Sequence, residues 1–248
     1  MDEATVRRLN AINRQFYVTV ADDFDATRGQ AWVGWEKLIE HLQPHPPTPS
    51  PGGEGEISVL DVGCGNGRFG VFLRDKLGAI RYHGMDNSAA LLDKARASLP
   101  DAILEERDIV ENSPDAGAYD LVVLFGVLHH LPGADRRLAF MRTLAERVAP
   151  GGWLVFTAWR FYEYPRFRDR VVPWEADLQV EAHDYLLDWR RGERALRYCH
   201  YVDDAEHARL IAATGLQPVA DYRADGFTGT VNRYTVLKNV KSGEERNA

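Results

Sequence analysis

The sequence contains little cysteine and no long apolar run. Cys64 and Cys199 are the two cysteines in 248 residues, and their spacing matches neither a disulfide framework nor a zinc motif, so we expect no metal. No apolar run approaches the roughly 18 residues of a membrane span, and the first residues, Met1 to Arg8, lack the apolar centre of a signal peptide. These absences predict a cytoplasmic protein that makes no membrane contact.

The chain also lacks an excess of positive charge. Its net charge is −7 and its pI is about 5.6, so no overall positive field attracts nucleic acid, and any contact with RNA has to be local. Apolar residues make up 45% of the chain and charged residues 27%, which is ordinary for a globular protein. The length suits one α/β domain with a sizeable core.

The stretch Ile57–Gly70 organises the rest of the chain. A short β-rich apolar run reaches Asp61, a turn with glycines at Gly63, Gly65 and Gly67 follows, and a helical pattern begins directly after it. Glycine permits positive φ and brings backbone N–H groups close to a ligand at a helix N-terminus. The carboxylate of Asp61 borders the same crevice, where it suits a cationic or hydroxyl-rich ligand.

Acids end the next two predicted strands as well. Asp86 and Asp108 follow apolar runs, and a fourth strand begins at Asp120 and leads to His129 and His130. A helix then ends at a Pro-Gly-Gly turn before a fifth strand. The glycine pattern alone also fits a nicotinamide- or flavin-binding domain, in which an acid at the second strand holds ribose hydroxyls.

Taken together, these motifs resemble the class I S-adenosylmethionine-dependent methyltransferases over Ile57–Thr157. The resemblance implies an α/β fold with a seven-stranded, mostly parallel Rossmann-like sheet whose last strand is antiparallel. Leu216–Tyr222 and Val231–Asn239 are two predicted strands that fit the final hairpin, which an ordinary nicotinamide-binding domain lacks. The implied cofactor is S-adenosyl-L-methionine.

The resemblance also assigns cofactor contacts. It places Asp61 near the amino-acid end of the cofactor, Asp86 at the ribose hydroxyls, and Asp108 with Ile109 at the adenine. Asn87 either flanks the adenine or caps the following helix. The complete predicted set is Tyr17, Asp61, Gly63, Gly65, Gly67, Asp86, Asn87, Asp108, Ile109 and Phe125.

We expect a single methyltransferase domain over residues 1–248. Within it, the pattern predicts an N-terminal helical cap, a flexible loop rich in proline and glycine, a cofactor-binding core, a lid insertion rich in arginine, acids and aromatic residues, and a C-terminal helix with a hairpin. These segments cover residues 1–42, 43–56, 57–158, 159–202 and 203–240.

A narrower resemblance appears outside the core. Several segments are similar to the tRNA wobble-uridine carboxymethyl methyltransferases and their uncharacterised bacterial relatives. They are the N-terminal run with Tyr17, Asp25–Arg28 and Trp32, and the segments Val127–Leu131, Asp184–Glu193 and Arg197–Tyr201. The resemblance implies esterification of a carboxymethyl group on tRNA and a small zinc-binding activator protein as partner. It places Arg28, His129 or His130, Trp189 and Arg190 at the transfer pocket. The loop rich in proline is not part of that pattern.

A carboxylate acceptor agrees with these residues, because a carboxylate is already nucleophilic at neutral pH and needs orientation more than a base. Arginine can orient it through two parallel hydrogen bonds, and Trp189 or Tyr185 can stack on a nucleobase. Two alternatives stay open. One is a methyltransferase for a small-molecule carboxylate or hydroxyl, and the other is a regulator that binds the cofactor without catalysis.

Overall fold

The computed structural model describes residues 1–26, 31–42, 56–175, 178–190 and 192–240. A seven-stranded sheet with the order β3-β2-β1-β4-β5-β10-β9 forms its centre. β10 is antiparallel to both of its neighbours, and the other six strands run parallel. The predicted fold class is therefore confirmed. The strands are β1 (Ile57–Val62), β2 (Ile80–Asp86), β3 (Ile103–Glu106), β4 (Tyr119–Leu124), β5 (Val148–Trp159), β9 (Gln217–Ala224) and β10 (Asn232–Lys238).

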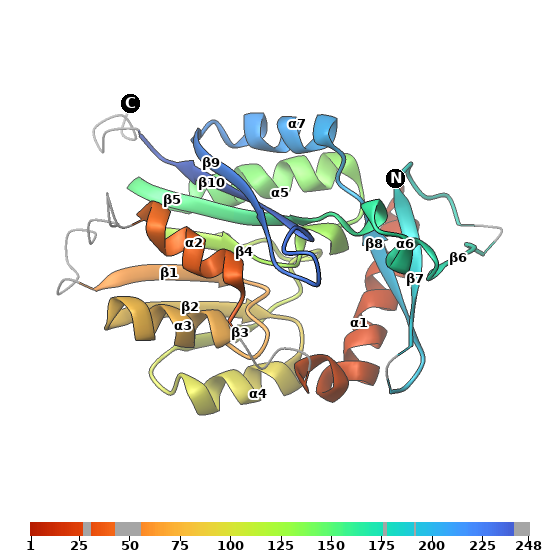
Figure 1. Cartoon of the computed structure of the whole chain (residues 1–248), viewed down its shortest axis with the longest axis horizontal. Coiled ribbons are helices and arrows are strands. Elements are labelled where there is room, and N and C mark those ends of the chain that lie inside the picture. Colours follow the sequence, from red (N-terminus) through yellow and green to blue (C-terminus); the bar gives the residue numbers. More distant parts are fainter. Residues whose placement is uncertain (27–30, 43–55, 176–177, 191, 241–248) are drawn as a thin grey trace.

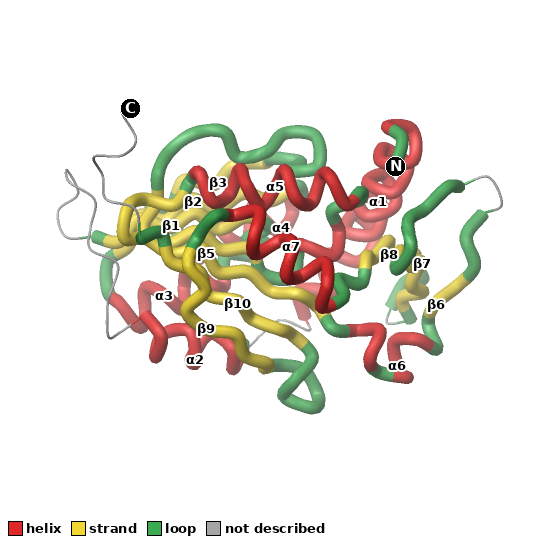
Figure 2. Tube along the Cα trace, turned by 90° about the horizontal axis from the view of Figure 1, so that it is seen from above, coloured by secondary structure: helices red, strands yellow, loops and turns green. Residues whose placement is uncertain are grey.

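Helices cover both faces of this sheet (Figures 1 and 2). Successive side chains of the central strands point to opposite faces, so Val59 packs with one apolar cluster and Leu60 with the other. One face carries α2 (Val33–Leu42), α3 (Arg68–Leu77) and α4 (Ala89–Ser98), and the other carries α5 (Ala134–Glu146) and α7 (Asp204–Thr214). The sheet is buried on both sides, as parallel sheets usually are.

The insertion after β5 forms a small sheet of its own. The sequence pattern predicts no strand there, yet β6 (Val171–Val172), β7 (Asp184–Trp189) and β8 (Ala195–His200) pair antiparallel in the order β6-β7-β8. The 3₁₀ turn η2 (Phe161–Glu163) and α6 (Pro165–Arg168) connect them to β5.

The two N-terminal helices pack in different places. α1 (Glu3–Ala26) runs beside β8 of the insertion (Figure 1). In α2, Trp35 and Leu38 are buried in the cluster that covers the main sheet. The first helix and the insertion thus form one layer over the strand ends, whereas the second helix belongs to the core.

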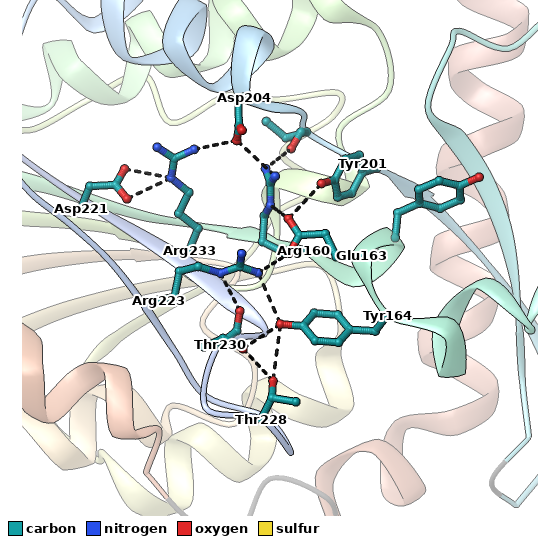
Figure 3. A network of polar contacts seen from close by, with 12 residues as sticks. Arg160, Glu163, Tyr164, Tyr201, Asp204, Asp221, Arg223, Thr228, Thr230 and Arg233 are labelled. Carbon is teal, nitrogen blue, oxygen red and sulfur yellow. Dashed lines mark hydrogen bonds and ion pairs between the residues drawn. The ribbon is translucent and has the colours of Figure 1, made fainter.

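Polar side chains attach the insertion to the C-terminal hairpin (Figure 3). Glu163 is central, because its two carboxylate oxygens accept hydrogen bonds from Arg160 and Arg223, each at 2.6 Å. Tyr201 donates to Glu163 at 3.1 Å, and Arg160 also lies 3.1 Å from Asp204 at the start of α7. We call Arg160, Glu163, Tyr201, Asp204 and Arg223 the anchor network.

Among the described residues, no helix combines the length and the apolar character that crossing a bilayer requires.

Candidate cofactor and transfer site

A cleft lies at the carboxyl ends of β1, β2, β3 and β4, where open α/β sheets bind ligands. It encloses about 1090 Å³ of space that no atom fills, its open mouth included. Most of the predicted contacts line it. These are Tyr17, Asp61, Gly63, Gly65, Asp86, Asn87, Asp108, Ile109, Phe125 and His130.

Two glycines of the turn between β1 and α3 have different structural roles. Gly65 lines the cleft with φ of 54°, and its N–H donates to Asp86 Oδ2 at 2.8 Å. Gly67 has φ of 75° and precedes α3, but it is not among the lining residues. A Cβ atom at Gly67 would lie 3.0 Å from the Cβ of Ala95 and 3.1 Å from a methyl group of Leu99. Gly67 therefore permits close packing of α3 on α4.

Backbone groups hold the Asp86 carboxylate at the end of β2. Oδ2 accepts from Gly65, and Oδ1 accepts from the N–H of Ser88 at 2.9 Å. Burial raises the pKa of Asp86, and the N–H groups of Ser88, Gly65 and Asn87 oppose that shift. Each oxygen retains a lone pair, so the carboxylate can still accept hydrogen bonds from ligand hydroxyls. Ser88 caps α4 by accepting from Leu91 N–H, which leaves Asn87 on the cleft wall.

Asp61 lies deeper in the cleft and is 2% exposed. Tyr82 donates to its Oδ2 at 2.5 Å. Burial raises the pKa of Asp61 to about 7, with a further contribution from Asp86, while Tyr82 and Arg68 oppose the shift. A cationic ligand group beside Asp61 would favour its ionised form. Arg68 stacks over the rings of Trp32 and Trp35 at 4.7 and 4.8 Å and borders the same end of the cleft.

Helix α1 supplies three side chains to the opposite wall. Asn10 donates to Asp108 Oδ2 at 2.7 Å, and Asn13 and Tyr17 reach His130. The sequence interpretation missed Asn10 and Asn13 as well as the cleft-lining Trp32 and Arg68. The spacing of Asn10, Asn13 and Tyr17, three and four residues apart, was an available signal, because such positions share one face of a helix.

The structure brings His130, but not His129, to the cleft wall. Tyr17 Oη lies 3.0 Å from His130 Nε2, and both Asn13 Nδ2 and the carbonyl oxygen of Tyr198 lie 3.1 Å from Nδ1. In the Nδ1–H tautomer, His130 donates to the Tyr198 carbonyl and accepts from the Tyr17 hydroxyl. In the Nε2–H tautomer, it accepts from Asn13 Nδ2 and donates to the Tyr17 oxygen. His129 is 5% exposed and packs between the rings of His130 and Trp159.

The other predicted transfer residues lie elsewhere. The Trp189 ring packs edge-on against Phe16 at 5.6 Å. Arg190 donates to Asp188 at 2.8 Å, and its side chain is 53% exposed. Neither residue lines the cleft. Arg28 lies outside the described residues.

The cleft fits a ligand that carries a cation, ribose hydroxyls and an adenine. Buried Asp61 provides a carboxylate for the cation, and Asp86 provides an acceptor for hydroxyls. Gly65 leaves open space on the ligand side, since a Cβ there would meet only a Leu91 methyl group at 4.0 Å. Ile109 and Val110 follow Asp108 on the cleft wall, and Asn87 lines the same cleft, which suits an adenine.

Comparisons with known proteins agree with this fit. A family described as "Methyltransferase domain" matches residues 27–221. The tRNA (carboxymethyluridine(34)-5-O)-methyltransferase ALKBH8 of Macaca fascicularis is 28% identical over 188 residues, which cover 75% of this chain and 26% of that protein. The chain thus spans about a quarter of the length of this relative, and 19% of the corresponding mouse protein.

The matches to another relative and to a solved structure cover a larger share of those proteins. Trans-aconitate 2-methyltransferase of Escherichia coli O1:K1 / APEC is 36% identical over 179 residues, covering 64% of this chain and 68% of that protein. The S-adenosylmethionine-bound amino pentose methyltransferase CalS10 of Micromonospora echinaspora superposes with a TM-score of 0.61 at 20% identity, covering 89% of this chain and 96% of its own.

Proposed function

The chain belongs to the methyltransferase domain family and is a class I S-adenosylmethionine-dependent methyltransferase, and we propose that it esterifies a carboxylate. The acceptor that we propose first is the carboxymethyl group of a wobble uridine in tRNA. The chain matches only one part of each tRNA relative. We therefore assign the activity of those full-length proteins to this chain only as part of this proposal.

The names of two groups of relatives support a carboxylate acceptor. One names carboxymethyluridine and the other names trans-aconitate, and both compounds carry carboxylates. The two groups differ in the size of the acceptor but share the chemistry of the methylated group. Shared acceptor chemistry is therefore a stronger basis for a proposal than either substrate alone.

The contacts of His130 are the structural observation that carries the proposal. Its ring nitrogens face Tyr17 on one side and Asn13 with the Tyr198 carbonyl on the other. This arrangement fixes the ring as part of the wall. A hydroxyl acceptor would need a group that removes its proton, whereas a carboxylate needs only proximity and orientation.

Each part of the chain has a role in this reaction. S-adenosylmethionine supplies an electrophilic methyl group when bound. Asp61, Asp86 and Asp108 would hold its cationic, ribose and adenine parts, and α1 with the insertion would keep water from the transfer site. The protein's task is then to bind and align two reactants.

A small polycarboxylate is the second candidate acceptor. The E. coli relative supports it, since the match covers 68% of that protein. The net charge of −7 does not attract RNA, although it would not favour a free polyanion either. Neither acceptor changes the proposed chemistry.

The test uses purified protein with S-adenosylmethionine labelled in its methyl group. The acceptors are tRNA bearing carboxymethyluridine, isolated from cells without this protein, and trans-aconitate. Mild alkali releases a methyl ester as volatile methanol, but it leaves methyl ethers and methylamines intact. We expect volatile label from tRNA and a methyl-ester nucleoside by mass spectrometry. Label that alkali does not release would contradict carboxylate methylation.

The same assay separates the other hypotheses. Label in trans-aconitate alone would favour the small-molecule acceptor. Cofactor binding without turnover on any acceptor would favour the regulator. Parallel reactions with an extract of cells that lack the protein would reveal a requirement for a small activator protein, which the resemblance implies.

A further inference from the structure

Arg197 of β8 lies between two aromatic rings where the insertion packs against α1. Its guanidinium carbon is 5.2 Å from the ring centre of Phe16 on α1 and 4.7 Å from that of Trp159 at the end of β5. The three elements meet where the insertion faces the core (Figure 1). Cation–π contacts of this kind hold a guanidinium in one place.

The positive charge of Arg197 has no acidic partner among the described residues. No carboxylate in those ranges lies within 4.0 Å of it, and its Nε is buried without a hydrogen-bond acceptor. The side chain is only partly exposed. Arginine stays protonated in proteins, so this is a fixed charge whose donors are not all satisfied.

Three side chains close to Arg197, those of Cys199, Phe16 and Trp159, carry no charge. Burial raises the pKa of the Cys199 thiol to about 11, although Arg197 opposes that shift, so the thiol carries no charge at neutral pH. Phe16 and Trp159 supply only ring faces. An anion would therefore be the natural partner of the Arg197 guanidinium.

Two chains of ring contacts connect Arg197 with His130 on the cleft wall. On one side, Phe16 contacts Tyr17 at 5.1 Å, and Tyr17 contacts His130 at 5.7 Å. On the other side, Trp159 contacts His129 at 5.1 Å, and the two histidine rings are 4.0 Å apart. Arg197 is not itself among the residues that line the cofactor cleft, and along each chain two rings lie between its guanidinium and His130 on the cleft wall.

Two described arginines line the cleft, and each already has a partner or a place beside the cofactor-binding residues. Arg107 pairs with Glu105 and Asp115. Arg68 lies over two tryptophans beside Asp61. Arg190, which the sequence resemblance favours, pairs with Asp188.

We propose that Arg197 binds the carboxylate of the acceptor and presents it for methylation. This inference rests on the proposed carboxylate chemistry and adds the residue that recognises the acceptor. The planar guanidinium offers two parallel donors to a carboxylate, and the flanking rings of Phe16 and Trp159 fix its plane.

The experiment measures acceptor binding directly. Protein saturated with S-adenosylhomocysteine, which cannot donate a methyl group, is titrated in a calorimeter with 5-carboxymethyluridine and with trans-aconitate. The neutral amide 5-carbamoylmethyluridine is the matched ligand. Arg197→Gln is compared with Arg194→Gln, an exposed arginine of the same β7–β8 hairpin. Arg197→Lys retains the charge and provides a second variant if Arg197→Gln folds poorly.

We expect Arg197→Gln to weaken binding of a carboxylate probe by at least about tenfold, because a charge-assisted pair is lost. Affinity for the neutral amide and for S-adenosylhomocysteine should stay within about twofold, as should all affinities of Arg194→Gln. Arg197→Lys should give an intermediate loss and, in turnover assays, a raised KM for the acceptor.

Several outcomes would overturn the inference. One is that Arg197→Gln binds the carboxylate probes as tightly as the unaltered protein, or loses affinity for the neutral amide to the same extent. Another is that Arg190→Gln, and not Arg197→Gln, loses affinity for the carboxylate probes. A third is that the unaltered protein binds no carboxylate probe. Failure of the proposed function gives a different pattern. In that case the methyl label resists alkali even though Arg197 governs the binding of the carboxylate probes.

Discussion

The carboxylate of Asp86 is positioned by backbone groups before any ligand arrives. The N–H groups of Gly65 and Ser88 point at its two oxygens, and its burial raises its pKa. A preformed acceptor of this kind does not have to be ordered when the cofactor binds, which lowers the cost of binding.

We predict that Asp86→Ala weakens S-adenosylmethionine binding by about tenfold to a hundredfold, roughly 1.4 to 2.7 kcal/mol, because a charged acceptor for hydroxyls is lost. Calorimetric titration measures the effect. Asp93→Ala is the control, since Asp93 lies on the adjoining helix with its side chain 75% exposed. A dissociation constant equal to that of the control would remove Asp86 from the site.

The residues that could be predicted are those whose role follows from nearby sequence. Asp61, Asp86 and Asp108 follow strands, and the carboxyl ends of parallel strands meet at one edge of a sheet. Arg197 and Asn13 could not be found in this way. Their positions depend on α1 packing against β8, a contact between segments about 185 residues apart.

At the scale of elements, the insertion is held from two sides. The anchor network links η2 to the C-terminal hairpin (Figure 3), and a buried network behind β8 links it to α5 and α7. In the latter, Glu206 accepts from Arg137 at 2.6 Å and contacts His200 at 2.6 Å. Asp184 contacts the other His200 nitrogen at 2.7 Å.

These contacts explain why the strands of the insertion could not be predicted. Leu187 and Cys199 pack toward Phe161, whereas Asp184 and His200 are buried on the other face in hydrogen bonds. Each face also mixes the two kinds of residue, because Leu186 lies between Asp184 and Asp188 on one face and Arg197 lies beside Cys199 on the other, so the sequence shows no alternation of apolar and polar residues. Although burial disfavours its charged form, the carboxylates of Asp184 and Glu206 raise the pKa of His200.

We predict that Glu163→Gln destabilises the protein by about 1 to 2 kcal/mol, because two charge-assisted hydrogen bonds lose their shared acceptor. Burial works against ionisation of Glu163, but hydrogen bonds from Arg223 and Arg160 lower its pKa overall. Urea unfolding measures the loss. Glu36→Gln removes an exposed ion pair with Lys76 and should cost less than about 0.5 kcal/mol. Equal losses in the two variants would show that the anchor network adds no stability.

At the scale of the whole molecule, two buried groups make stability depend on pH in opposite directions. The pKa of Asp61 is about 7 instead of 3.8, so the folded state holds more protons than the unfolded state between these values, and the free energy of unfolding falls as pH rises. Burial, with the nearby charge of Arg233, lowers the pKa of His207 from 6.5 to about 4. Between these two values the folded state holds fewer protons than the unfolded state, and the free energy of unfolding falls as pH falls.

We predict that these two effects largely cancel between pH 5 and pH 7 in the cofactor-free protein, each being on the order of 2 kcal/mol by proton linkage. Asp61→Asn keeps an acceptor for Tyr82 but cannot ionise, so the slope of its stability with pH should be more positive than that of the unaltered protein across this window. In His207→Gln the slope should be more negative than in the unaltered protein. Urea unfolding at both pH values measures the two slopes, and every other titrating group is common to the three proteins. Parallel slopes in all three would mean that neither group has a shifted pKa. A more positive slope in Asp61→Asn than in the unaltered protein, together with weaker S-adenosylmethionine binding, would show that the fold gives up stability at neutral pH to keep a buried carboxylate for the cation of its cofactor.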